Sequence, residues 1–147
     1  MATYLLDMNI LLRMSDATCA DHLLAGQSVA KLLLRNDEVY LTAQNLIEFW
    51  SVATRLLNVN GLGWTIQQTA TEIEAIQNKF PLLPDSPDIF SHWLSLVKIH
   101  DIKGRKVHDA RLVAVMLAHS IANLLTFNAG DFKSFTHITA HHPNDIN

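Results

Sequence analysis

Four acidic residues that are far apart in the chain each adjoin an apolar segment. They are Asp7, Glu48, Asp109 and Asp131. In sheets of parallel strands, functional groups gather beyond the carboxyl ends of the strands, in the crevice where the strand order reverses. We therefore expect the four carboxylates to meet there. Two carboxylates about 4 Å apart repel by roughly 4 kcal/mol at an effective dielectric of 20, so such a cluster persists only with bound protons or cations.

The chemistry of these side chains predicts a magnesium or manganese site. Oxygen ligands from Asp and Glu suit hard divalent ions. Zinc is disfavoured, because Cys19 is the only cysteine and the eight histidines show no zinc-site spacing. A divalent ion can activate a water molecule and neutralise phosphate charge during an in-line displacement. The four acids therefore predict phosphodiester hydrolysis, and each is expected to be both a catalytic residue and a metal ligand.

Each acid taken alone also has a simpler structural explanation. Asp7 could cap the helix that follows it, and Asp109 could favour a helix N-terminus through the helix dipole. Glu48 could lie on a solvated helix face, and Asp131 beside Gly130 could belong to a turn. Asp109 is the most informative of the four, because it adjoins a nearly continuous apolar run at the edge of the predicted core. The four together favour the catalytic interpretation.

Basic residues precede Asp109 directly. Lys103, Arg105 and Lys106 could bind phosphates at the mouth of the site, and a solvated loop is an equal alternative. His108 could contact substrate or position Asp109, or it could be purely structural. The net charge is −3, so a nucleic acid must be held by such local cations or through the metal ion.

Strands and helices are expected to alternate along the chain, which predicts an α/β fold of three layers with a mostly parallel central sheet. Apolar runs closed by polar residues predict strands at 3–6, 39–42, 82–83, 123–126 and 137–140. Helical periodicity and capping residues predict helices at 9–14, 21–34, 44–57, 66–80, 87–100 and 110–119. For the helix at 66–80, Thr65 and Gln68 predict a capping box, and the predicted apolar stripe consists of Ile66, Ala70, Ile73, Ile76 and Phe80. The tryptophans Trp50, Trp64 and Trp93 are expected in the core or at an interface, and the pair His141 and His142 in a frayed tail.

Composition narrows the class of protein further. The 147 residues predict one domain, 1–147, and 49% hydrophobic content excludes a disordered chain. Only 17% of the residues are charged, against about 25% in typical domains, which suggests that a second copy or another protein covers apolar surface. Cys19 has no partner for a disulfide, so we expect a reducing, cytoplasmic location. No segment approaches the roughly 18 apolar residues that span a bilayer, so no membrane association is expected.

Four sequence segments resemble the PIN-domain family, and in particular the VapC-like toxins of prokaryotic toxin–antitoxin pairs. They follow one another in the family's order and run across essentially the whole chain. The segments are Tyr4-Leu-Leu-Asp-Met-Asn9, Asn45-Leu-Ile-Glu-Phe49, Val107-His-Asp-Ala-Arg-Leu-Val-Ala114 and Leu125-Thr-Phe-Asn-Ala-Gly-Asp-Phe132.

The resemblance implies a Rossmann-like sheet, a homodimer, and a metal-dependent endoribonuclease that an antitoxin protein holds inactive. It implies that the four acids bind or orient the metal ion while Asn9, Thr126 and Asn128 support them through hydrogen bonds. Two positions depart from the family pattern. Met8 replaces a small polar residue, and Asn128 stands where many members carry another acid, which leaves open whether a second metal ion binds.

Other functions remain open from the sequence. A nuclease that cuts DNA or a particular nucleic-acid structure could use the same acids, although its usual additional elements are not visible. A degenerate PIN-like binding module is a further alternative, which the retention of four mutually repelling acids argues against. A receiver-type phosphoacceptor would need paired acids after the first strand, and Asp7-Met8-Asn9 lacks the pair.

Overall fold

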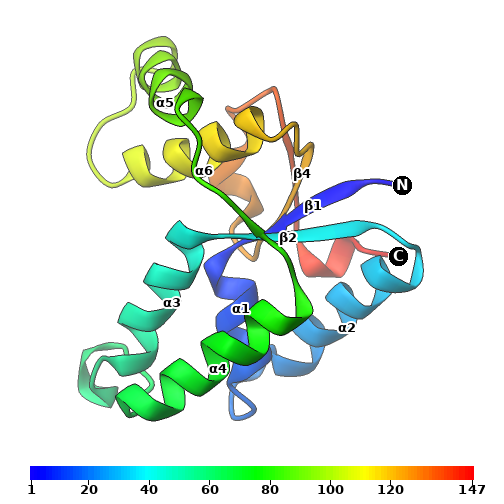
Figure 1. Ribbon diagram of the computed structural model, residues 1–147, viewed down its shortest axis with the longest axis vertical. Helices are drawn as coiled ribbons and strands as arrows, with labels where there is room; N and C mark the ends of the chain where they lie inside the picture. Colours follow the sequence, from blue (N-terminus) through cyan, green and yellow to red (C-terminus); the bar gives the residue numbers. More distant parts are fainter.

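The centre of the molecule is a parallel sheet of five short strands (Figure 1). The computed structural model describes residues 1–147. The strand order is β3-β2-β1-β4-β5, and every neighbouring pair runs parallel. The strands are β1 (Thr3–Leu6), β2 (Glu38–Thr42), β3 (Leu82–Leu83), β4 (Asn123–Leu125) and β5 (Thr139–His141).

Helices cover both faces of this sheet, and the predicted three-layer α/β fold is confirmed. One face carries α1 (Met8–Ser15), α2 (His22–Leu34), α3 (Ala43–Thr54) and α4 (Ile66–Lys79). The other carries α5 (Asp88–Ile99) and α6 (Lys106–Ala118). Short 3-10 helices are η1 (Leu57–Val59), η2 (Ala129–Phe132) and η3 (Pro143–Asp145). No helix is both long and apolar enough to cross a membrane.

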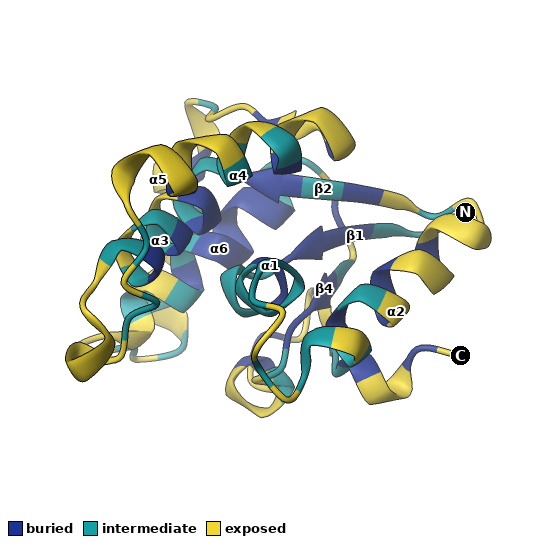
Figure 2. Ribbon diagram, turned by 90° about the horizontal axis from the view of Figure 1, so that it is seen from below, coloured by how far each residue is buried: buried dark blue, intermediate teal, exposed yellow.

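Strand β1 contributes to both hydrophobic cores, because successive side chains of a strand point to opposite faces. Tyr4 and Leu6 pack in the cluster beneath α1 to α4, whereas Leu5 packs in the cluster beneath α5 and α6. Figure 2 shows the result, with β1, β2 and β4 buried along most of their length and helices that mix buried, intermediate and exposed residues. The apolar run at 3–6 is thus the continuous pattern expected of a strand that is covered on both faces.

The order of the strands reverses between β1 and β4. From β1 the chain adds β2 and β3 on one side, and then crosses through α5 and α6 to β4 on the other side. The backbone N–H of Asp7 donates to the carbonyl of Leu125 at 3.0 Å, so the ends of β1 and β4 lie side by side. This is the crevice at which an open α/β sheet binds its ligands.

Helix α3 ends three residues earlier than predicted, at Thr54 instead of 57. Arg55 is extended, with φ −62° and ψ 150°. The chain then folds back, so that the N–H groups of Leu62 and Trp64 donate to carbonyls in the last turn of α3 at 3.1 and 2.9 Å. These bonds satisfy carbonyls that a longer helix would have satisfied.

Two helix starts also differ from the prediction. Helix α6 begins at Lys106, so Asp109 lies in its first turn and does not precede the helix. Helix α5 begins at Asp88, and the hydroxyl of Ser86 does not cap it. The side-chain oxygen of Ser86 is instead buried without a hydrogen-bond partner.

The remaining helices and strands lie close to their predicted ranges, with local exceptions. The capping box of Thr65 and Gln68 at the start of α4 is confirmed. Its apolar stripe is shorter than predicted, because the side chain of Ile66 is 63% exposed. The predicted frayed tail is wrong, since His141 belongs to β5 and the ring of His142 accepts a hydrogen bond at the start of η3.

Candidate active site

Asp7 is fixed at the junction between β1 and α1. Its Oδ1 accepts a hydrogen bond from the backbone N–H of Met8 at 2.8 Å, which caps α1. Its Oδ2 accepts one from the hydroxyl of Thr126 at 2.8 Å. Burial raises the pKa of Asp7, and both hydrogen bonds oppose that rise because they favour the ionised form. These two hydrogen bonds orient the carboxylate of Asp7, but neither of them comes from a cation that would neutralise its charge.

Asn9 and Thr126 connect α1 to the loop after β4. Asn9 donates from Nδ2 to the hydroxyl oxygen of Thr126 at 3.2 Å and accepts from the backbone N–H of Phe127 at 3.1 Å. The backbone N–H of Asn128 also donates to that hydroxyl, at 3.0 Å. Asn128 therefore contacts the network through its backbone, and the residue itself is exposed. Together these bonds hold Asp7 against the end of β4.

Asn45 anchors α3 to the end of β1. Thr42 caps α3 by accepting from the N–H of Asn45 at 3.2 Å, and Asn45 donates from Nδ2 to the carbonyl of Leu6 at 2.7 Å. Asn45 is fully buried, and its Oδ1 has no hydrogen-bond partner. This contact fixes the first turn of α3 beside Asp7 and so positions Glu48 one turn further on. One signal in the sequence could have indicated this role, a polar residue at an otherwise apolar position of α3.

Glu48 faces Asp7 and α6. Burial raises the pKa of Glu48, a hydrogen bond from Gln44 at 3.4 Å lowers it, and the negative charge of Asp7 raises it further. Gln44 also donates to the carbonyl of His108 at 2.9 Å and accepts from Arg111 at 3.2 Å. Gln44 and Arg111 thus join α3 to α6, and nothing in the sequence pointed to a contact between residues so far apart in the chain.

Asp109 experiences the charges of all three other acids. Burial is the largest cause that raises its pKa to about 6, and the charges of Asp7, Asp131 and Glu48 add to the rise. Only the positive charge of Lys106 opposes them. Asp131 itself is exposed within η2. Four carboxylates from four separate segments therefore act on one another electrostatically at the carboxyl edge of the sheet.

The donor set fits a hard divalent ion in its chemistry, since it consists of carboxylate oxygens. Its geometry is open, because no three side chains of Asp, Glu, His or Cys lie close enough together to hold one ion. A metal ion bound here would have to draw the carboxylates toward itself.

The predicted substrate-binding residues differ in their relation to these acids. Lys106 is the first residue of α6 and is close enough to favour the ionised form of Asp109. The backbone carbonyl of His108 accepts the hydrogen bond from Gln44, and the charge of His108 favours ionisation of Glu48. Lys103 and Arg105 are exposed beside Gly104, whose φ of +63° turns the chain into α6, and neither forms an ion pair with the acids.

Comparison with known proteins identifies the family. The PIN domain family model matches residues 4–137, so the chain belongs to the PIN domain family. No curated protein sequence matches it significantly.

Several solved structures of similar fold are VapBC complexes or a VapC toxin. A chain of VapBC2 from Rickettsia felis, bound to a DNA fragment from its promoter, has a TM-score of 0.70 at 14% identity and covers 95% of this chain and 98% of its own. A chain of VapBC-1 from nontypeable Haemophilus influenzae has a TM-score of 0.70 at 17% identity, with coverage of 97% and 99%. VapC20 from Mycobacterium tuberculosis, described as a toxin that cleaves the sarcin–ricin loop, has a TM-score of 0.63 at 18% identity, with coverage of 90% and 95%.

Proposed function

We propose that this chain is a metal-dependent endoribonuclease that uses Mg²⁺ or Mn²⁺ and is the toxin of a toxin–antitoxin pair. The observation that carries the proposal is the raised pKa of Asp109, about 6, caused by burial and by three other acids that come from different segments of the chain. Mutual repulsion of this kind is unfavourable for folding, so it indicates a functional reason for keeping the four acids together. Membership of the PIN domain family supports a nuclease.

The protein's own residues would act mainly by holding and orienting groups. Asp7, Glu48, Asp109 and Asp131 would hold the metal ion, which when bound would neutralise phosphate charge and lower the pKa of a water molecule. The hydroxyl of Thr126 keeps Asp7 Oδ2 in a fixed direction. This arrangement restricts the carboxylate before substrate arrives, which is the pre-organisation that such sites require.

RNA is the proposed substrate in preference to DNA. The similar fold of VapC20, a toxin described as cleaving the sarcin–ricin loop, favours RNA. At the mouth of the site, the charge of Lys106 and the ring of His108 are available to a phosphate, and we propose the more distant Lys103 and Arg105 as weaker contacts.

Partners are proposed from two further observations. Several solved structures of similar fold are toxin–antitoxin complexes, which supports an antitoxin partner. The surface also exposes large apolar side chains that a second copy or an antitoxin would cover, among them Leu23, Leu34, Ile47 and Leu57. We further propose a homodimer and a cytoplasmic location, the latter because the proposed substrate is RNA and Cys19 is a free thiol.

The test combines metal binding with cleavage. Calorimetric titration of the full chain with MnCl₂ should give heat of binding that the Asp7→Asn variant loses, because Asn keeps the helix cap but removes one charge. Matched RNA and single-stranded DNA oligonucleotides, each with Mn²⁺ or excess chelator, should give cleavage of RNA in Mn²⁺ alone. Cleavage in chelator would overturn the metal dependence, cleavage of DNA alone would favour the DNA nuclease, and tight binding of RNA without cleavage would favour a degenerate binding module.

A further inference from the structure

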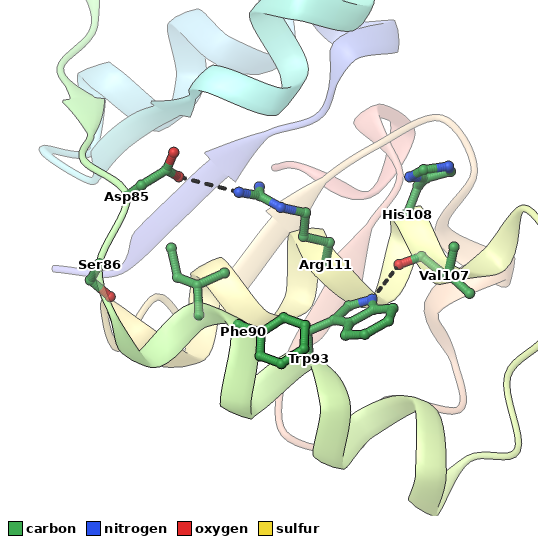
Figure 3. A pocket seen from close by; sticks show the side chains of 8 residues that line it. Asp85, Ser86, Phe90, Trp93, Val107, His108 and Arg111 are labelled. Atoms are coloured by element: carbon green, nitrogen blue, oxygen red, sulfur yellow. Dashed lines mark hydrogen bonds and ion pairs between the residues drawn. The ribbon is translucent and has the colours of Figure 1, made fainter.

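A groove of about 440 Å³ lies between α5 and α6, lined in part by His108, the residue before Asp109 (Figure 3). This volume is toward the lower end of the range of roughly 300–1,000 Å³ found for ligand pockets. Half of the residues that line it are hydrophobic. Its aromatic wall and its polar rim consist chiefly of Asp85, Ser86, Phe90, Trp93, His108 and Arg111.

The aromatic wall combines one fixed ring with one exposed ring. Phe90 and Trp93 are neighbours on α5, with ring centroids 5.6 Å apart and ring planes inclined by 31°. The indole N–H of Trp93 donates to the carbonyl of Val107 at 2.8 Å, which fixes the ring against α6. The side chain of Phe90 is 66% exposed, so its ring is accessible to a ligand. Trp93 is partly buried and packs against the core beneath α5 and α6, which agrees with the core position expected from the sequence, and its remaining surface lines the groove.

Polar groups converge on the same groove. The hydroxyl of Ser86 is buried and has no hydrogen-bond partner in the protein. Arg111 reaches across the groove from α6 to Asp85, with 3.4 Å between Nη2 and Oδ1 (Figure 3). Both side chains of this ion pair are partly exposed, so the pair can open at little cost. The groove therefore offers a guanidinium and a carboxylate beside an aromatic ring, and the unpaired hydroxyl of Ser86 lies beneath its surface.

The groove continues toward the acids. A second hollow of about 340 Å³ is lined by Gln44 and Glu48 and shares Asp85, His108 and Arg111 with the first. A ligand that lies across both hollows would contact Glu48 at one end and Phe90 at the other.

We propose that the groove of Phe90 and Trp93 binds one unpaired base of the RNA substrate, next to the phosphate that is cleaved. This inference rests on the proposed nuclease function. Proteins recognise single-stranded RNA by stacking splayed bases on aromatic rings and by hydrogen bonds to the base edges. Phe90 supplies the ring, while Arg111 supplies donors and Asp85 an acceptor for the edge of the base.

The features of the groove favour a base over a protein segment. A helix docked in a groove needs apolar anchors spaced over at least two turns. Here Phe90 is the exposed large apolar side chain of the first hollow and Ile47 that of the second, and the charged residues Asp85 and Arg111 line both hollows. Continuity with the acid-lined hollow also places the groove about where a neighbouring nucleotide of a bound strand would lie.

Photo-crosslinking tests this assignment directly. The full-length Asp109→Asn variant, in which we expect cleavage to be lost, would be bound to unstructured oligouridylates that carry 5-bromouridine at one position each, and then irradiated. Mass spectrometry should find the crosslink on Phe90 or Trp93 for one or two adjacent positions of the oligonucleotide. Crosslinks distributed over other surfaces, with none in this groove, would overturn the inference.

Affinity measurements give a second, independent readout. Phe90→Ala should weaken binding of the same oligonucleotide on the order of tenfold, because one stacked base is lost. Phe90→Tyr should restore it. Ile99→Ala is the matched control, since Ile99 is 72% exposed on the same helix and does not line the groove. Melting curves of the variants would verify that they fold equally well.

The outcomes separate this inference from the proposed function. If the unmodified chain neither binds nor cleaves RNA, the proposed function fails and the inference fails with it. If the chain cleaves RNA but Phe90→Ala binds and crosslinks as before, only the base-binding groove is overturned. If Phe90→Ala leaves RNA affinity intact but breaks a dimer or an antitoxin complex, the groove is a protein interface and the inference is wrong.

Discussion

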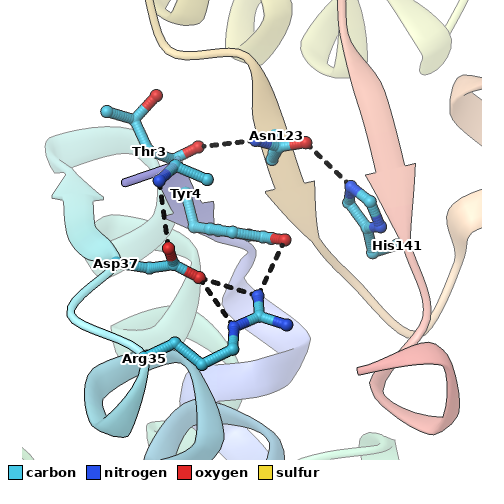
Figure 4. Close-up of polar contacts among 7 residues, drawn as sticks. Thr3, Tyr4, Arg35, Asp37, Asn123 and His141 are labelled. Atoms are coloured by element: carbon cyan, nitrogen blue, oxygen red, sulfur yellow. Dashed lines mark hydrogen bonds and ion pairs between the residues drawn. The ribbon is translucent and has the colours of Figure 1, made fainter. Parts of the chain in front are cut away.

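Aspartates at the two ends of the central sheet have pKa values shifted in opposite directions. At the amino end, Asp37 accepts hydrogen bonds from the backbone N–H of Ala2 at 3.0 Å and from the guanidinium of Arg35 at 3.0 and 2.7 Å (Figure 4). These contacts, the backbone bond first, lower the pKa of Asp37. At the carboxyl end, burial and three other acids raise the pKa of Asp109 to about 6.

This difference separates the part of the sheet that stabilises the fold from the part that is available for function. At the amino end, Arg35 also contacts the hydroxyl of Tyr4 at 3.4 Å, and Asn123 connects the backbone of Thr3 to the ring of His141. Almost every polar group drawn in Figure 4 has a partner inside the chain. The acids at the carboxyl end lack such cationic partners, as expected where a ligand supplies the missing charge.

The largest expected effect is on catalysis at the carboxyl end. Asp109→Asn should reduce RNA cleavage by on the order of 10³-fold, because removing a proposed metal ligand would forfeit several kcal/mol of transition-state stabilisation. Initial rates with saturating Mn²⁺ would measure the loss. Glu74→Gln is the control, since Glu74 is an exposed acid on α4. If the activity of Asp109→Asn lies within tenfold of that of the unmodified chain, the acids at the carboxyl end of the sheet do not form the catalytic site.

The second prediction concerns the hydroxyl that orients Asp7. Thr126→Val keeps the shape of a fully buried side chain but deprives Asp7 and Asn9 of their shared partner. We expect the free energy of unfolding to fall by about 2 kcal/mol and the pKa of Asp7 to rise further. Urea denaturation would measure the first effect. Thr126→Ser retains the hydroxyl, so its free energy of unfolding should fall clearly less than that of Thr126→Val. Equal losses of stability in the two variants would show that only the packing of this side chain matters.

The third prediction is that Asp109→Asn stabilises the metal-free protein. Folding raises the pKa of Asp109 from 3.8 to about 6, so the folded state holds the proton more tightly than the unfolded state. The carboxylate therefore lowers the free energy of unfolding progressively as pH rises from about 4 to about 6. Because Asp109 is partly exposed, we expect a gain of about 1 kcal/mol in Asp109→Asn at pH 8, below the roughly 3 kcal/mol of the full shift.

Unfolding curves at two pH values would test this gain. At pH 8 in chelator the variant should be the more stable protein, whereas below pH 4 the two should coincide. A variant that is less stable at pH 8 would mean that Asp109 contributes to the fold, as Asp37 does.

The smallest effect is expected at the amino end, and its dependence on pH has the opposite sign. The pKa of Asp37 is lowered on folding, so its stabilisation is present above the ordinary value of 3.8 and is lost as pH falls through the folded value. Asp37→Asn should reduce the free energy of unfolding by about 1 kcal/mol at pH 7. The same curves recorded at low pH should show no difference, and a loss that persists there would point to packing instead of charge.

Local patterns in the sequence were sufficient for most of the fold. The apolar run of β1 and the capping box of Thr65 and Gln68 involve neighbouring residues only, and both were predicted correctly. The end of α3 was not, because loop N–H groups that bond back to its last turn decide it. The start of α6 was also misjudged, since Arg105 and Lys106 carry no capping signal.

The four acids could be named from the sequence because each adjoins a segment whose position in a parallel sheet is predictable. The residues that contact the elements around these acids could not be predicted from the sequence. Asn45 contacts Leu6, and Gln44 contacts His108 and Arg111, across separations that no local pattern encodes.

The alternation of strands and helices and the types of side chain at the strand ends follow from the order of residues alone, because both depend on local periodicity and on residue chemistry. Three features depend on the tertiary structure. The hydroxyl of Thr126 donates to Asp7, and the charges of three other acids raise the pKa of Asp109. Phe90 and Trp93 line a hollow that adjoins the one lined by Glu48. The physical reason is that burial and electrostatic interaction depend on distance through space, which the order of strands sets only once the chain has folded.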